Sequence, residues 1–148
     1  MQVILIRYHF NQDFGQGSSD VVKTRYLVRR ISPHITGKRV KMFSARTYEG
    51  LEVAKIASQE LSTHHEPTDA LGHAPSLIPG FAALSGLISQ YQYEYEVIIF
   101  VVHRIAVTCF PSWYGVNHFN LERIPMDKVP TKDQFPIIDT GTGSTTVI

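Results

Sequence analysis

The sequence predicts an α/β fold, a three-layer α/β/α sandwich in which helices cover both faces of a mostly parallel sheet. Two runs of apolar, largely β-branched residues, 3–6 and 97–102, are typical of strands buried on both faces. Between these runs, a third strand-like segment at 40–44 is preceded and followed by apolar residues at helical spacing. Strands that alternate with helices along the chain favour parallel pairing in one sheet.

The composition is that of one compact domain spanning residues 1–148. The chain has 43% hydrophobic and 18% charged residues, and its formal net charge of +1 predicts no nucleic-acid partner. A lone cysteine, Cys109, excludes an internal disulfide and a cysteine-based zinc site, and it suits a reducing compartment. No run approaches the ~18 apolar residues of a membrane span, and the first residues do not resemble a signal peptide. We therefore expect a cytoplasmic protein that has no membrane partner.

The first helix is expected after a polar loop at residues 10–20, which is long enough to lie over the end of the first strand. Ser19 or Asp20 can cap this helix, which should end near Ser32 and Pro33. The opposite, basic face is expected to be solvated. The residues predicted to face the core are Val21, Val22, Tyr26, Leu27 and Ile31.

The second strand, 40–44, leads into a helix expected over residues 45–61. Residues 62–75 are predicted to form a loop that contains His64, His65, Glu66 and His73. Adjacent side chains on an irregular segment do not converge as a helical i, i+4 pair does, so no metal site is expected. The inward side of the helix is predicted to consist of Leu51, Val53, Ala54, Ile56, Ala57 and Leu61.

The rest of the chain is expected to contain a helix at 78–91, the buried strand at 97–102 and a helix at 105–113. Residues 116–136 lack periodicity and are predicted to form a loop with at most one short strand, and residues 144–148 a closing β-branched strand. In open α/β sheets, ligands bind beyond the carboxyl ends of the strands. Arg7 follows the first strand, and His103 and Arg104 follow the strand at 97–102, so basic side chains should gather at one crevice.

Four segments in order resemble the histidine phosphatase superfamily (phosphoglycerate mutase-like), most closely its small SixA-type phosphohistidine phosphatases. Residues 1–7 match the family's opening strand, which runs into Arg-His-Gly, and residues 44–52 (SARTYEGLE) follow its Ser-Pro-x-x-Arg-Ala-x-x-Thr motif. Residues 75–79 (PSLIP) are similar to a Pro-Glu-Leu-x-Pro segment, and residues 97–103 to the strand that ends in a second histidine. The resemblance implies a phosphoglycerate mutase-like sheet with an antiparallel last strand.

The resemblance also implies that several catalytic positions are substituted. In the family, the histidine after the first arginine attacks phosphorus, two arginines and a second histidine bind the phosphate, and an acidic residue donates a proton. Here Tyr8 stands at the nucleophile position, Tyr48 at the second arginine and Ser76 at the acidic position, whereas Arg7 and His103 are retained. A phenol with a pKa near ~10 is a poor nucleophile without a base, and a tyrosine lacks the charged fork of arginine.

Neighbouring residues offer partial substitutes. His9 follows Tyr8, and Arg46 precedes Tyr48 by two, but an extended chain turns His9 to the opposite side. As a helical residue, Arg46 would sit about 200° around the helix from Tyr48. Arg104 could supply charge beside His103.

Three functional hypotheses follow. The leading one is a catalytically impaired, histidine-phosphatase-like protein that binds a partner or a phosphorylated group near Arg7 and His103, without a cofactor or a metal. The second is an active phosphatase, for phosphohistidine or phosphomonoesters, that uses His9 or His103. The third is an interaction module with no ligand in the pocket.

Overall fold

The computed structural model describes residues 2–8, 10–71, 77–103, 106, 110, 137–139 and 144–147. Its strands form a sheet in the order β3-β2-β4-β1-β6-β5. The first four strands are parallel, and β6 pairs antiparallel to both of its neighbours, β1 and β5. The elements along the chain are β1 (Gln2–Arg7), α1 (Ser19–Arg29), α2 (Ser32–Ile35), β2 (Val40–Ser44), α3 (Tyr48–Leu61), β3 (His65–Pro67), the 3₁₀ turn η1 (Asp69–Leu71), α4 (Leu77–Tyr91), β4 (Val97–Val102), β5 (Ile137–Asp139) and β6 (Ser144–Val147).

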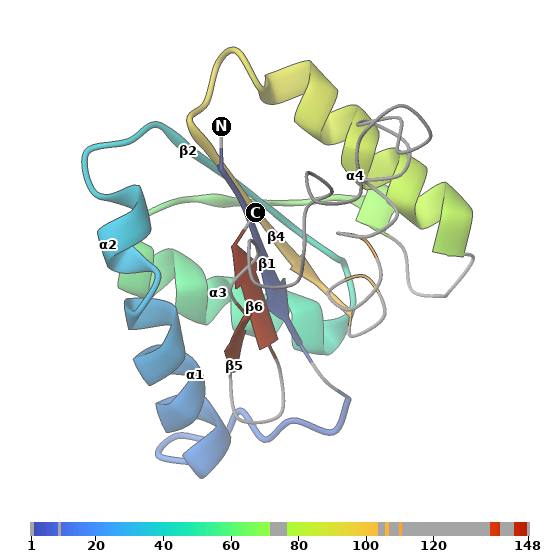
Figure 1. The fold of residues 1–148 in the computed structure, drawn as a ribbon. Helices are drawn as coiled ribbons and strands as arrows, with labels where there is room; N and C mark the ends of the chain where they lie inside the picture. Colours follow the sequence, from blue (N-terminus) through green and yellow to red (C-terminus); the bar gives the residue numbers. More distant parts are fainter. Residues whose placement is uncertain are drawn as a thin grey trace.

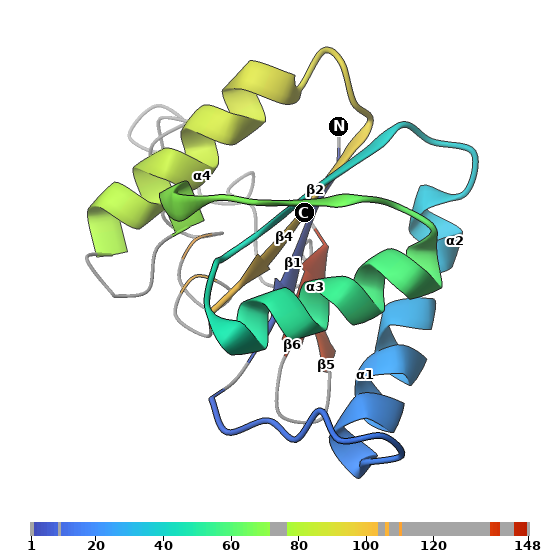
Figure 2. The ribbon, with the colours of Figure 1, turned by 180° about the vertical axis from the view of Figure 1, so that it is seen from behind.

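The predicted α/β/α layering is confirmed. Figure 1 shows α4 on one side of the sheet and α1 with α2 on the other, and Figure 2 shows α3 running alongside the sheet towards α1 and α2. On the α4 side, Phe43 of β2 stacks on Phe100 of β4 at 5.7 Å between ring centroids, and Tyr91 of α4 lies 5.4 Å from Phe43. Aromatic packing therefore joins α4 to the middle of the sheet.

The three central strands agree with the sequence. β2 and β4 have the predicted bounds, and β1 contains the predicted run 3–6, which is buried throughout. β6 pairs antiparallel to β1, as the family resemblance implied. These strands could be predicted because a strand that is covered on both faces needs apolar residues at successive positions.

The core face of α1 differs from the prediction. Val22 and Tyr26 are exposed, while Thr24 and Val28 are buried with Leu27. The stripe that faces the core follows helical spacing but includes a threonine, because the Thr24 hydroxyl donates to Asp20 O at 2.7 Å and accepts from the Gln12 side chain at 2.9 Å. A buried hydroxyl with both partners can replace an apolar side chain in the stripe.

The ends of α1 also differ. Ser18, rather than Ser19 or Asp20, is the N-cap and accepts from Val21 N at 3.3 Å. The helix ends at Arg29, and Pro33 lies in the first turn of the short helix α2, where a proline needs no backbone donor.

The segment after α3 was wrongly predicted to be a loop throughout. His65–Pro67 forms β3, which pairs parallel to the end of β2, and Asp69–Leu71 forms a 3₁₀ turn. Three residues of strand carry too little periodicity to be recognised in a sequence. Of the helix predicted at 105–113, Ala106 and Phe110 are described and helical, whereas the loop predicted at 116–136 lies outside the described residues.

The basic face of α1 packs against α3 instead of being wholly solvated. Arg25 Nη1 and Arg29 Nε lie 3.1 and 2.7 Å from the two carboxylate oxygens of Glu60, whose side chain is 12% exposed.

No described helix is long and apolar enough to cross a lipid bilayer.

Glu60→Gln should destabilise the fold by at most about 1 kcal/mol, because it removes the charge that joins α1 to α3 while both arginines stay partly solvated. The arginines hold the pKa of Glu60 below its usual value, so this stabilisation is present at neutral pH and is lost as the pH falls through the folded-state pKa. Urea unfolding at neutral pH measures the loss of stability in Glu60→Gln, and this loss should be smaller at high salt. Glu52→Gln, on the same helix but with no ion pair among the described residues, is the control.

Candidate functional site

Arg7 and His103 come from neighbouring strands and reach the same edge of the sheet. β1 and β4 pair in parallel from Gln2↔Val97 to Arg7↔Val102, and the pairing continues one step further as Tyr8 N donates to Val102 O at 3.0 Å. Because parallel strands end on the same side, the residues that follow both strands are neighbours. The prediction that these two strands end side by side is confirmed.

The end of β2 adds the N-terminus of α3 to this edge. Ala45 N donates to Val101 O at 3.1 Å, so the chain leaves the sheet beside β4 and then enters α3. Thr47 caps the helix, and its Oγ1 accepts from Gly50 N at 3.0 Å. The helix therefore begins at Tyr48 and not at Ala45 as predicted.

Tyr8 fills the space beside this helix terminus. Its side chain is 1% exposed, and its Cε1 lies 3.2 Å from the position that a Cβ on Gly50 would take. The hydroxyl lies near the Thr47 side chain, but none of the described residues gives this oxygen a hydrogen bond of good geometry. Burial raises the pKa of Tyr8 above its usual value of 10.0, Thr47 partly opposes this rise, and Glu49 adds to it. The phenol is protonated at neutral pH.

His103 is held as a neutral hydrogen-bond donor. Its Nδ1 accepts from Ala106 N at 3.4 Å, so in the neutral ring the proton resides on Nε2. Burial lowers the pKa of His103 below its usual value of 6.5. At neutral pH the ring can therefore donate from Nε2 to an anion, while the lone pair of Nδ1 is occupied.

Arg46 and Tyr48 are both exposed and have partners of their own. Arg46 precedes α3 instead of lying within it, which corrects the helical angle that we expected between these two residues. Its Nε lies 3.0 Å from Asp69 Oδ1, and the Tyr48 ring contacts Phe14 at 5.8 Å between centroids. An exposed ion pair is weak, so an anion could compete with Asp69 for Arg46.

Three of the predicted site residues, His9, Arg104 and Ser76, lie outside the described residues. The polar loop that precedes α1 is described from Phe10 onward and is fixed by its own side chains, since Asp20 accepts from Asp13 N at 2.9 Å and Ser18 donates to Asp13 O at 2.7 Å. Its Phe14 packs against the core.

Sequence reasoning missed the aromatic residues of this loop. Phe10 contacts the Tyr8 ring at 6.1 Å between centroids, and Phe14 contacts Tyr48. The available signal was two phenylalanines in an otherwise polar segment, because large apolar residues in a polar loop usually need a surface to cover.

Gly50→Ala should destabilise the protein by about 1–3 kcal/mol, because the added methyl group would lie 2.7 Å from Thr47 Oγ1 and 3.1 Å from Ala45 O. Gly86→Ala on α4 is the matched control. Nothing lies within 4 Å of its added Cβ, and a helical alanine should stabilise by about 0.5–1 kcal/mol. Urea unfolding of both variants checks the pair, and equal effects would contradict the close packing at Gly50.

The stability should fall as the pH is lowered from about 7.5 to about 5.5, because the unfolded chain protonates His103 more readily than the folded protein does. His103→Asn keeps an acceptor for Ala106 N but removes the titrating ring. The loss of stability of this variant over the same interval should be smaller. The partly buried His65, whose pKa is also lowered by burial, acts equally in both proteins. Thermal unfolding at both pH values measures the difference, and identical losses would refute it.

Comparison with known proteins gives structural relatives only. No protein-family model and no curated protein matches the sequence. A protein from Nakamurella multipartitia assigned as phosphohistidine phosphatase SixA superposes with a TM-score of 0.63 at 11% identity, over 99% of this chain and 83% of that chain. One from Agrobacterium tumefaciens, assigned likewise, gives 0.55 at 10% identity, over 82% and 80%.

A third relative is the protein histidine phosphatase SixA complexed with tungstate. It superposes with a TM-score of 0.52 at 12% identity, over 88% of this chain and 81% of that chain. Identities this low establish a shared architecture. The chain therefore has the fold of the SixA phosphohistidine phosphatases, as the resemblance of its sequence segments predicted.

Proposed function

We propose that this protein binds phosphate, or a phosphorylated group, between Arg7 and His103 and does not hydrolyse it. The two residues supply complementary donors, a charged planar fork from Arg7 and the Nε2 hydrogen of a neutral imidazole from His103. They leave neighbouring parallel strands, so one small oxyanion can lie against both. The lone cysteine favours the reducing cytoplasm as the place where this binding occurs.

The observation that carries the loss of hydrolysis is the buried phenol of Tyr8. By resemblance this is the position of the attacking histidine, and a protonated phenol in an apolar environment has no free lone pair comparable with that of imidazole. A phenolate would be needed for attack, and burial makes that form harder to reach. The reaction therefore lacks its nucleophile while the oxyanion donors remain.

The same geometry disfavours His103 as a substitute nucleophile. An imidazole attacks through an unprotonated nitrogen, and here Nδ1 is the unprotonated nitrogen but already accepts from Ala106 N. His103 is better suited to donating a hydrogen bond than to forming a bond to phosphorus. The remaining alternative, attack by His9, is tested by measuring turnover in His9→Ala.

A tetrahedral oxyanion is also the ligand chemistry of one structural relative, the SixA protein complexed with tungstate. Tungstate resembles phosphate in shape and charge. This supports phosphate as the first ligand to test on the shared fold.

Isothermal titration calorimetry should detect phosphate and vanadate binding to the purified protein. Arg7→Ala should weaken binding at least about tenfold, because it removes a bidentate charged donor, and Arg7→Lys should retain part of the affinity. The matched control is Arg39→Ala, an exposed arginine paired with Glu96 where β2 and β4 begin, which should bind as the wild type does. Assays with a chromogenic phosphomonoester and with a phosphohistidine donor should show no turnover.

Two outcomes would overturn this proposal. Turnover that is abolished by His9→Ala would establish an active phosphatase with a displaced nucleophile. Absence of phosphate and vanadate binding in a folded wild-type protein would leave an interaction module with no ligand at this edge of the sheet.

A further inference from the structure

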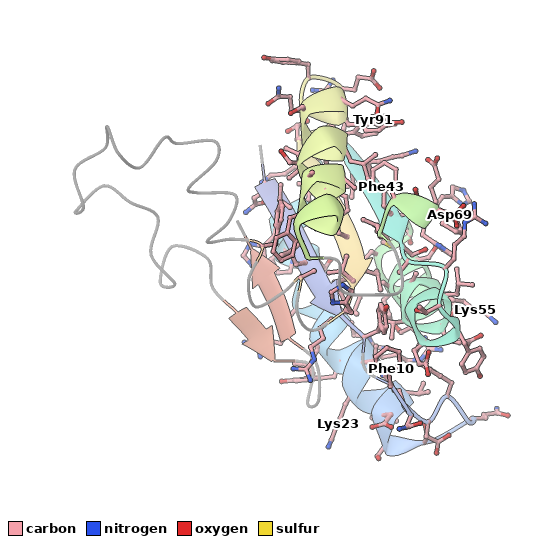
Figure 3. All side chains as sticks on the ribbon, turned by 90° about the vertical axis from the view of Figure 1, so that its right-hand side faces the viewer. Phe10, Lys23, Phe43, Lys55, Asp69 and Tyr91 are labelled. Atoms are coloured by element: carbon pink, nitrogen blue, oxygen red, sulfur yellow. The ribbon has the colours of Figure 1, made fainter. Side chains whose placement is uncertain are left out.

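An exposed group of aromatic side chains adjoins the proposed phosphate site. It consists of Phe10, Phe14 and Tyr48, and we call it the aromatic rim. Phe10 and Tyr48 are 60% and 65% exposed, and Phe14 is partly buried against the core. Figure 3 shows Phe10 at the end of the sheet where β1 stops, close to α1.

Tyr8 links the aromatic rim to Arg7. The Phe10 ring meets the Tyr8 ring edge to face at 6.1 Å and 88°, and Tyr8 directly follows Arg7 in the chain. On its other side Tyr8 packs against Gly50, in the first turn of the helix that begins with Tyr48. Tyr48 in turn meets Phe14 edge to face at 5.8 Å and 85°. Tyr8, the residue after Arg7, therefore contacts Phe10 on one side and the helical turn that carries Tyr48 on the other.

Exposed rings beside an anion site select for the group attached to the anion. Large apolar side chains at a surface lose contact with water when another ring packs on them, and aromatic pairs gain further from offset or edge-to-face geometry. In an aryl phosphate a single oxygen joins the ring to phosphorus, so its two recognition elements must be neighbours. An alkyl phosphate of one carbon offers no ring to this surface.

We propose that the aromatic rim binds the aryl group of an aryl phosphate whose phosphate lies between Arg7 and His103. This inference rests on the proposed function, because it assumes that the phosphate site exists, and it adds the chemical class of the attached group. A phosphotyrosine side chain and a small phenolic phosphate share this chemistry.

Calorimetric titration with phenyl phosphate, methyl phosphate and inorganic phosphate tests the inference. The wild type should bind phenyl phosphate roughly tenfold more tightly than methyl phosphate. Tyr48→Ala and Phe10→Ala should each reduce this ratio towards one and leave the affinity for inorganic phosphate unchanged. Tyr48→Phe, which keeps the ring, should preserve the ratio.

Tyr93→Ala is the matched control, because Tyr93 is an equally large ring, 86% exposed, in the turn between α4 and β4 where β4 begins. It should leave all three affinities unchanged. Equal binding of phenyl and methyl phosphate by a protein that binds inorganic phosphate would overturn this inference alone. Failure to bind any of the three would overturn the proposed function, and the inference with it.

Comparing a phosphotyrosine peptide with phenyl phosphate then separates the two sources of the aryl group. Tighter binding of the peptide would assign the site to a phosphoprotein, and tighter binding of phenyl phosphate would assign it to a small molecule. Both results are consistent with a preference for aryl over methyl phosphate.

Discussion

The parallel pairing of β1 with β4 is the constraint on which the candidate site depends. Every residue of β4 is buried, and the register is continuous over six residue pairs, from Gln2↔Val97 to Arg7↔Val102. A slip of one residue would exchange the side chains that pack on the two faces of the sheet and leave one end of each apolar run unpaired, so the packing on both faces favours this register. The same register sets Tyr8 beside the end of β4, and thereby decides which groups meet where the strands stop. The pairing that buries the two strands therefore also fixes the positions of the residues at their ends.

The buried ring of Tyr8 extends the hydrophobic core to the end of the sheet where β1 and β4 stop. The ring is held by contact with Gly50 and adjoins the cap of α3, so the position is now part of the packing of that helix. Tyr8→His would therefore open a space at this position as well as supply an imidazole. The neighbours of residue 8 would have to repack around the smaller ring.

Strands and strand ends could be predicted from this sequence, and contacts between distant segments could not. β2 and β4 were predicted to the residue, and His103 directly follows β4 as expected, because strands buried on both faces must be continuously apolar. The predicted run 3–6 lies within β1, which extends to Arg7. The core face of α1 was misplaced because Thr24 is polar by type yet satisfied in the interior. The aromatic rim depends on how a polar loop lies against α3, and no local pattern encodes that.

The two outermost strands of the sheet, β3 and β5, have three residues each. Pro67 ends β3, and its ring carries no N–H that could extend the ladder, while Glu66 and Lys41 place an ion pair across the last two strands on that side. Short edge strands that carry a proline and charges discourage a strand of another molecule from adding to the sheet. The β3 edge should therefore resist edge-to-edge aggregation, even though the interior strands are among the most apolar segments of the chain.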